Sequence, residues 1–195
     1  MTATSSTRAV SRELGLRVGV WRPDLSHSAV LFSIRHLGLA KVRGRFDRFA
    51  ATLSVGETIA ETRVEATIDL ASINTNNGDR DAHLRSTDFF SVADHPEMRF
   101  VSVGIEGADE EWMLRGDLTL NGRTRPVALD VEFNGIEEFP GANRVHAGFT
   151  ATGAIRRSEF GIEFGMLKIG ADKLALGDEV KIELDFEFIQ PEEGA

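Results

Sequence analysis

Regular alternation of apolar and polar residues is the feature of this chain that most limits what it can fold into. Near the centre of the sequence, Val127, Leu129, Val131 and Phe133 stand at every second position. Successive side chains of a β-strand point to opposite faces, so such a segment has one apolar and one polar face. The pattern recurs in about nine segments, which span residues 16–21, 29–36, 41–55, 64–70, 98–105, 112–120, 127–133, 144–155 and 180–188. The sequence therefore predicts an all-β protein.

The connections between these segments indicate hairpins. Asn121-Gly122 stands between two alternating segments, and this dipeptide is preferred in two-residue type I′ turns. Asn134-Gly135 and Pro140-Gly141 predict the end of the next strand and a longer loop. Most gaps are too short for the helical crossover that parallel strands require. We therefore expect the strands to be antiparallel.

One interval, residues 72–96, lacks the alternation. Within it, residues 76–86 predict a short helix with Asp79 and Asp81 in its early turns, where carboxylates complement the helix dipole. A second helical turn is expected at residues 88–93, before Pro96. The predicted fold is a set of antiparallel strands with a short helical insert near residues 76–93. The pattern alone leaves a barrel and a two-sheet sandwich both open.

Length and composition fit one globular domain. The chain has 195 residues, which we divide into a flexible N-terminal tail (1–14), a folded domain (15–190) and a C-terminal tail (191–195). A formal net charge of −9 argues against general binding to nucleic acids. The absence of cysteine excludes disulfides and thiolate zinc sites. No apolar run is long enough for a membrane-spanning helix or a secretory signal, so we expect a cytoplasmic protein.

A series of short motifs adds to this pattern. The motifs occur in order at residues 21–36, 69–90, 95–100, 116–127, 157–161 and 177–180. Together they resemble the YceI-like family over nearly the whole domain, and the ordered series is far more specific than any one motif. The chain departs from the family pattern at Leu25, Ala51 and Glu159, where proline, glycine and aspartate are usual.

The resemblance implies an extended lipocalin-like antiparallel β-barrel of about eight strands with a helix near one end. It also implies binding of a long apolar amphiphile, such as a polyisoprenoid quinone, a prenyl diphosphate or a fatty-acyl lipid. The expected function is therefore to carry or store such a lipid without catalysis. No cofactor other than a bound isoprenoid lipid or quinone is expected, and the resemblance makes a homodimer plausible.

The apolar faces of the strands are the first candidate site. Burying a lipid tail in a lumen contributes about 25 cal/mol per Å² of apolar surface. Alternation alone favours a second interpretation, in which the same side chains fill a solid core. The resemblance favours the lumen. The residues expected to line it are Phe32, Ile34, Phe46, Ile68, Leu84, Phe89, Phe90, Phe100, Leu118, Leu120, Val131, Phe133 and Phe149.

A polar cluster near the helical insert is the second candidate site. It comprises His36, Arg80, Asp81 and His83. These residues are expected to orient a polar head group at the rim, with Asp81 holding His83 in one tautomer. An equally open alternative is a structural network that fixes the insert to the barrel, with Arg80 bound to carbonyls at strand ends.

No metal site is expected from the sequence. The five histidines include no pair with the spacing of an HExxH motif. Asp79, Asp81 and His83 would supply only part of a mixed site, since further ligands would have to come from elsewhere.

One strand is expected to carry a basic stripe, made of Lys41, Arg43 and Arg45 on one face. We interpret it as an ordinary solvated face that lies opposite the acidic residues of segment 183–187. The alternative is that it attracts an anionic head group or makes transient contact with a membrane surface during ligand transfer.

Catalytic signatures such as a GxSxG elbow or a Walker loop do not occur, so we expect a protein that is not an enzyme. Two alternatives to the lipid carrier stay open. One is a barrel enzyme (isomerase, cyclase or hydrolase) that acts on an apolar substrate through His36, Asp81 and His83. The other is a stress-response interaction module with a filled core.

Overall fold

The structure is a computed structural model that describes residues 14–108, 111–139, 144–169 and 173–190. Apart from Leu14, the two predicted tails (1–14 and 191–195) lie outside the described residues, as does Pro140-Gly141. No helix within the described ranges combines the length and the apolar character needed to cross a membrane.

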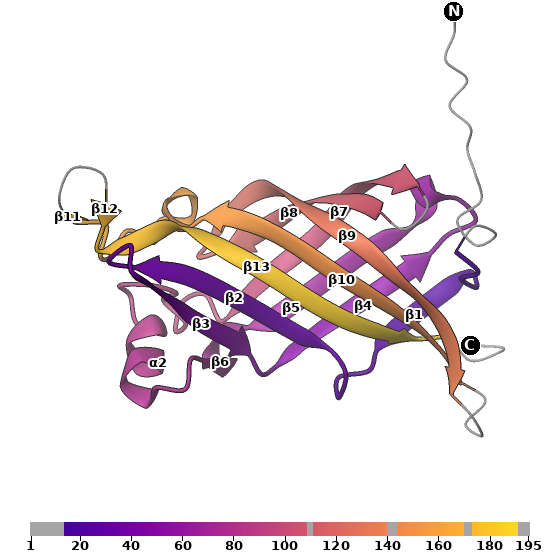
Figure 1. Cartoon of the computed structure of the whole chain (residues 1–195), viewed down its shortest axis with the longest axis horizontal. Helices are drawn as coiled ribbons and strands as arrows, with labels where there is room; N and C mark the ends of the chain where they lie inside the picture. The colour runs from indigo at the N-terminus through magenta and orange to yellow at the C-terminus, as the bar shows by residue number, and fades with distance from the viewer. Residues whose placement is uncertain (1–13, 109–110, 140–143, 170–172, 191–195) are drawn as a thin grey trace, which may run out of the picture.

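Long strands and short helical segments make up the fold (Figure 1). The strands are β1 (Gly19–Pro23), β2 (Ala29–His36), β3 (Ala40–Phe46), β4 (Phe49–Val55), β5 (Arg63–Asp69), β6 (Ile73–Asn74), β7 (Glu97–Ala108), β8 (Glu111–Leu120), β9 (Arg123–Phe139), β10 (Arg144–Arg156), β11 (Lys168–Ile169), β12 (Lys173–Leu174) and β13 (Leu176–Ile189). The helical segments are α2 (Gly78–Leu84) and the 3₁₀ turns η1 (Ile59–Glu61), η2 (Leu70–Ser72) and η3 (Arg157–Phe160).

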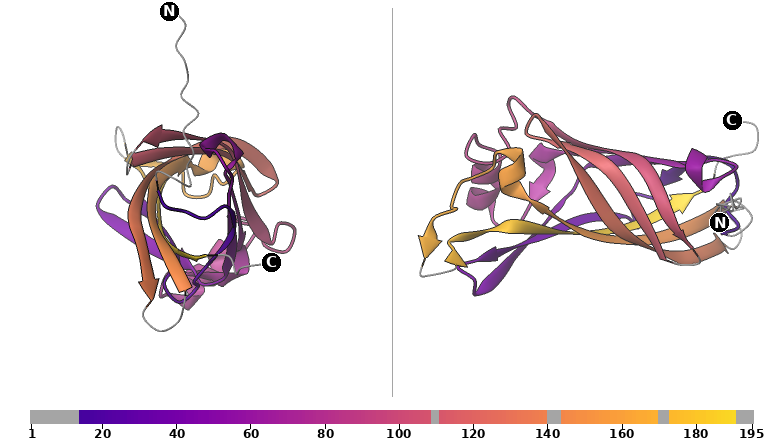
Figure 2. Two further views of the ribbon diagram at one scale, coloured as in Figure 1. Left: turned by 90° about the vertical axis from the view of Figure 1, so that its right-hand side faces the viewer. Right: turned by 90° about the horizontal axis from the view of Figure 1, so that it is seen from above.

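The strands close into an antiparallel barrel. In the main sheet the order is β1-β4-β5-β7-β8-β9-β10-β13-β2-β3-β6, and a further pairing of β1 with β13 closes it. Both β1 and β2 lie along the same edge of β13, so they act as two halves of one bent strand. Likewise, β3 pairs with β2 and β4 pairs with β1, so β3 and β4 act as two halves of the next strand. The result is the predicted closed barrel of eight long strands (Figure 2).

One predicted turn is confirmed and one is wrong. Asn121 and Gly122 have φ of 50° and 71°, and Leu120 faces Arg123 across the hairpin, as a type I′ turn requires. In contrast, Asn134-Gly135 does not end its strand, because β9 continues to Phe139. On β10, Gly148 pairs with Gly135 and Phe149 with Phe133, so Asn134 is the extra residue of a β-bulge.

The helical insert is shorter than predicted. Asn77 caps α2 by accepting a hydrogen bond from the backbone N–H of Arg80. Residues 88–93 form hydrogen-bonded turns instead of a helix. The positive φ of Ser91 (47°) is the local reason, since this conformation interrupts a right-handed helix.

The N-terminal segment before β1 closes the end of the barrel opposite α2 (Figure 1). Trp21 is fully buried there, and its indole Nε1 donates a hydrogen bond to the carbonyl oxygen of Arg17 at 2.8 Å. Leu16 is buried beside it, and Leu14 packs against the same apolar cluster. This end is therefore filled by side chains, whereas the other end carries α2 and the loop after η3.

Candidate functional site: a lumen with a polar mouth

The barrel encloses a cavity of about 630 Å³. This volume lies within the range of roughly 300–1,000 Å³ that small-molecule sites occupy. The cavity extends from Leu16 and Ile59 near the closed end to His83 and Phe164 near α2. Side chains from every long strand line it, because one face of each alternating segment points inward.

All of the predicted lumen residues except Phe133 line this cavity. Phe133 instead packs in the cluster at the closed end, with its ring 5.2 Å from that of Phe149. Several lining residues of β13 were missed, including Ile182 and Leu184. They follow the same alternation as the predicted lumen residues, so the sequence contains the signal for them.

Polar side chains are few in the lining, and they gather at one end. They are His36, Thr62, Arg80, His83 and Arg157. Only Thr62 lies toward the closed end, and its hydroxyl is bonded to the Thr58 carbonyl and the Gly56 N–H. In the described part of the chain, the lining residues classed as exposed are His36, His83 and Phe164. The cavity therefore reaches solvent beside α2, and we call this region the mouth.

Arg157 holds the wall of the mouth together. Its side chain is buried, and burial lowers the pKa of the guanidinium, while the nearby Asp178 carboxylate opposes that effect. The guanidinium donates hydrogen bonds of 2.7–3.1 Å to the carbonyl oxygens of Ile162, Phe164, Leu176 and Gly177. These bonds attach the loop after η3 to the start of β13. The sequence carries no local signal for this role, because the role depends on contacts with loops.

His83 lies in an aromatic group at the mouth. Its Nε2 is 2.8 Å from a carboxylate oxygen of Asp88. Its ring meets the rings of Phe89 and Phe164 edge-to-face, with centroid distances of 5.1 and 4.8 Å. The predicted pairing of His83 with Asp81 is therefore wrong, because residues two apart on a helix point to different sides.

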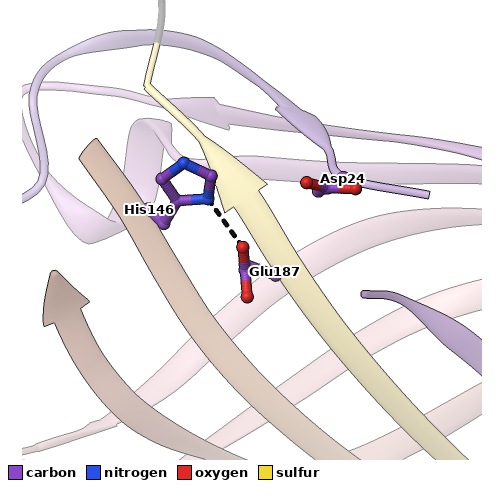
Figure 3. Close-up of side chains that lie close together, drawn as sticks. All are labelled: Asp24, His146 and Glu187. Atoms are coloured by element: carbon purple, nitrogen blue, oxygen red, sulfur yellow. Dashed lines mark hydrogen bonds and ion pairs between the residues drawn. The ribbon is translucent and has the colours of Figure 1, made fainter. Parts of the chain in front are cut away.

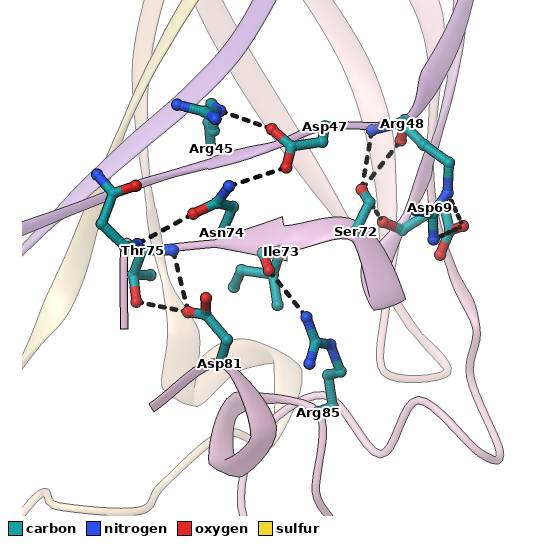
Figure 4. Close-up of polar contacts among 11 residues, drawn as sticks. Arg45, Asp47, Arg48, Asp69, Ser72, Ile73, Asn74, Thr75, Asp81 and Arg85 are labelled. Carbon is teal, nitrogen blue, oxygen red and sulfur yellow. Dashed lines mark hydrogen bonds and ion pairs between the residues drawn. The ribbon is translucent and has the colours of Figure 1, made fainter. Parts of the chain in front are cut away.

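Asp81 belongs to a structural network on the outside of the mouth (Figure 4). Its buried carboxylate accepts hydrogen bonds from the backbone N–H and the hydroxyl of Thr75. Arg80 donates to the same threonine, through Nε to the hydroxyl and through Nη2 to the carbonyl. Arg85 adds bonds to the carbonyl oxygens of Ala71 and Ile73. These contacts fix α2 to β6 and favour the structural interpretation for Asp81.

The basic stripe was expected to lie opposite the acidic residues of β13, and this prediction is wrong. On β3, Arg45 and Arg43 pair across to Leu31 and Ser33 of β2, which separates them from β13. Arg45 forms an ion pair with Asp47 instead, with 2.6 Å between Nε and Oδ1.

Two of the residues that would supply only part of a mixed metal site also lie apart, since Asp81 faces Thr75 and His83 faces Asp88. The structure brings a different set together near the closed end, consisting of Asp24, His146 and Glu187 (Figure 3).

Comparison with known proteins places this barrel in a family. A model of the YceI-like domain matches residues 21–188. The chain belongs to the YceI-like family. Two relatives named UPF0312 protein match this YceI-like chain over 167 residues, at 39% identity in Staphylococcus epidermidis and 37% in Staphylococcus aureus. Both alignments cover 85% of this chain and 94% of the relative.

Solved structures agree with the YceI-like fold. The YceI protein of Campylobacter jejuni has a TM-score of 0.69 and 30% identity, over 82% of this chain and 91% of that one. BcnA of Burkholderia cenocepacia has a TM-score of 0.70 at 24% identity, over 87% and 99%. A polyisoprenoid-binding domain of Saccharophagus degradans has a TM-score of 0.62 at 15% identity, over 90% and 100%. At such low identities the last two show a common fold only.

Proposed function

We propose that this YceI-like barrel binds a long apolar amphiphile in its lumen and carries or stores it without catalysis. The observation that carries the proposal is the asymmetry of the cavity. Its length is lined by Phe, Leu, Ile and Val side chains, whereas His36, Arg80, His83 and Arg157 gather at the mouth. An amphiphile matches this arrangement if its tail lies along the barrel and its head group stays at the mouth.

The proposed ligand class is a polyisoprenoid quinone, a prenyl diphosphate or a fatty-acyl lipid. The motifs that this chain shares with the YceI-like family are the reason for including an isoprenoid tail, and the fold is shared with a polyisoprenoid-binding domain of Saccharophagus degradans. The imidazoles of His36 and His83 offer donors to a carbonyl or an anionic head group. Arg80 adds its positive charge and its Nη1, since its Nε and Nη2 are bonded to Thr75. Arg157 is bonded to backbone carbonyls, so it shapes the mouth and contributes less to the head group.

The arrangement of polar groups supports binding over catalysis. The enzyme alternative required Asp81 and His83 to act together, but Asp81 faces Thr75 and lies outside the cavity lining. His83 and Asp88 form a pair at the mouth, where the histidine is exposed to water. A His83→Ala variant is therefore expected to retain the bound lipid unchanged in mass.

Organic extraction of the purified protein followed by mass spectrometry tests the proposal. We expect about one lipid per chain, and native mass spectrometry reports its mass together with the subunit number. The matched variants are Leu118→Trp, which adds an indole inside the lumen, and Val101→Trp, which adds one on the exposed face of the neighbouring strand. The lumen variant should lose most of its lipid, while the surface variant keeps it.

Circular dichroism must show that both variants are folded. The proposal fails if the wild-type protein carries no lipid and binds neither prenyl quinones nor prenyl diphosphates. It also fails if folded Leu118→Trp takes up as much lipid as Val101→Trp.

We further propose that the mouth contacts an anionic membrane surface during lipid transfer. Four exposed apolar side chains surround it, and we call them the apolar rim: Leu37, Leu39, Phe164 and Leu167. Backbone hydrogen bonds join the two loops that carry them, from Leu37 N–H to the Ala175 carbonyl and from Ala175 N–H to the Leu167 carbonyl, both at 2.9 Å. Phe164 is also part of the cavity lining, so apolar surface continues from the rim into the lumen.

A further inference from the structure

Four side chains with metal-binding groups meet near the closed end of the barrel, away from the mouth. Asp24 and His27 come from the turn between β1 and β2, His146 from β10 and Glu187 from β13. We call these four residues the seam cluster, because β1 pairs with β13 beside them to close the barrel. Ligand atoms of Asp24, His146 and Glu187 all lie within 4.8 Å of one another (Figure 3).

Distances within the seam cluster fit a tetrahedral ion. His146 Nδ1 is 2.6 Å from Glu187 Oε1, and His27 Nδ1 is 3.2 Å from Asp24 Oδ2 and 3.8 Å from Glu187 Oε1. Zinc binds imidazole nitrogen and carboxylate oxygen at about 2.0–2.2 Å, which places neighbouring ligand atoms about 3.3–3.5 Å apart. These three distances bracket this value, and the ligand atoms of Asp24, His146 and Glu187 all lie within 4.8 Å of one another. These three residues therefore form the core of the site, and the exposed His27 side chain would complete it by a change of rotamer.

The backbone of the seam cluster is held in place without a metal. The Asp24 N–H donates to the Glu187 carbonyl at 2.7 Å, and the Glu187 N–H donates to the Ser28 hydroxyl at 3.1 Å. The Ser26 N–H binds Asp24 Oδ1 at 2.8 Å, so Oδ2 is the oxygen that faces His27. Hydrogen bonds of this kind orient the ligands of metal sites and limit the rearrangement that binding requires.

We propose that the seam cluster binds a divalent transition metal of the zinc type. The ligands are His27 Nδ1, His146 Nδ1, Asp24 Oδ2 and Glu187 Oε1, a set of imidazoles and carboxylates that suits Zn²⁺. The proton that His146 Nδ1 shares with Glu187 leaves that nitrogen, and the neutral ring then carries its proton on Nε2. His27 is 65% exposed and gives the ion a path from solvent, whereas His146 is only 17% exposed.

The bound ion would join the turn after β1 to β10 and β13 at the seam of the barrel. Its role is structural, and it does not depend on whether the lumen holds a lipid. Sequence spacing gave no signal for it, because the ligands come from three segments that only the barrel brings together.

The test uses the full chain without a purification tag, first treated with a chelator. Native mass spectrometry and calorimetry with ZnCl₂ should show one ion per chain, and Co²⁺ should give the visible spectrum of a tetrahedral site. Zinc should also raise the melting temperature. Glu187→Gln and His146→Gln should each weaken zinc binding by roughly tenfold or more. The matched control is His83→Gln, which changes the His83–Asp88 pair at the mouth and should bind zinc as the wild type does.

Circular dichroism of the chelated variants shows whether each is folded before zinc is added, and Asp24→Asn provides a further variant if one is not. Stoichiometric zinc in the wild type that is lost from the seam variants, but not from His83→Gln, supports the proposal. Two results overturn it: no stoichiometric zinc in the wild type, or equal zinc affinity in the wild type and the folded seam variants. Lipid content serves as an independent measurement, so failure here is distinguishable from failure of the proposed lipid binding.

Discussion

Two glycines explain how a lumen rich in phenylalanine stays open. Gly44 pairs across the sheet with Phe32, and a Cβ at Gly44 would overlap the Phe32 ring. A Cβ at Gly116 would likewise overlap the ring of Phe100, which lies on the neighbouring strand. Each ring therefore lies across a glycine of the next strand, close to the wall. Larger residues at these two positions would push the rings toward the centre of the cavity.

Replacing one of these glycines should reduce lipid capacity. We expect Gly44→Ala to displace the Phe32 ring into the lumen, to lower the amount of bound lipid and to cost about 1–3 kcal/mol of unfolding free energy. Lipid content by mass spectrometry and urea denaturation measure the two effects. Gly104→Ala is the matched control, because no atom lies within 4 Å of a Cβ at that strand position. Equal lipid content in the two variants would contradict this account of Gly44.

At the scale of the secondary-structure elements, the break between β3 and β4 positions the mouth. Asp47 and Arg48 separate the two strands, and among the described strands β6 pairs with β3 alone. Asp47 accepts hydrogen bonds from Arg45 and from the Asn74 side chain, which belongs to β6 (Figure 4). Because β6 leads directly to the residues that bind α2, these bonds extend the support of the helix to the barrel wall.

The charge of Asp47 should make part of this support dependent on pH. Hydrogen bonds from Asn74 and Arg45 hold the pKa of its carboxyl below the usual value. A lowered folded-state pKa stabilises the protein above the unfolded pKa of about 3.9, and the effect is lost as pH falls through the folded pKa. Asp47→Asn should therefore cost about 0.5 kcal/mol near neutral pH, a small value because the carboxylate is partly exposed.

Urea denaturation from pH 7 down to pH 3 measures this effect. The difference between Asp47→Asn and the wild type should shrink below about pH 4. Asp117→Asn, at an exposed position on β8, is the control and should change stability little at any pH. A difference for Asp47→Asn that stays constant over the whole range would show that its charge is not responsible.

The elements also show which parts of the fold could be predicted from the sequence. Alternation is a local property that directly reports which face of a strand is buried, so the strands and most of the lumen residues followed from it. The prediction that Asn134-Gly135 ends a strand was wrong because a β-bulge satisfies the same backbone preferences as a turn. The roles of Arg157 and Asp81 depend on contacts with loops and with β6, which no local pattern encodes.

On the scale of the whole molecule, the two ends of the barrel differ, as the proposed lipid carrier would require. One end is closed by the N-terminal segment around Trp21, and the other has the polar mouth and the apolar rim. The chain has a net charge of −9. Close in sequence to the residues of the apolar rim, however, there are three exposed basic residues, Arg35, Lys41 and Lys168, and the exposed acidic Glu163. Among the described residues Arg35 and Lys41 have no ion-pair partner, and they face each other across the β2–β3 hairpin. These two cations favour the proposed contact of this end with an anionic membrane, whereas the exposed Asp79 and Asp88 near α2 oppose it.

If the apolar rim inserts into a membrane, charge placed on it should prevent docking. Leu39 and Leu167 are 76% and 73% exposed, so Leu39→Asp and Leu167→Asp should leave the fold intact. We expect the double variant to lose most of its binding to phosphatidylglycerol-containing vesicles in a co-flotation assay, because inserting a carboxylate into the interface is unfavourable. Leu25→Asp, at a position 60% exposed in the turn after β1, should bind like the wild type.

Binding of the wild type to these vesicles should also weaken as the salt concentration rises, because salt screens the charges of Lys41 and Arg35. Equal flotation of the rim variant and Leu25→Asp, or equal binding to vesicles of pure phosphatidylcholine, would argue against docking through the mouth.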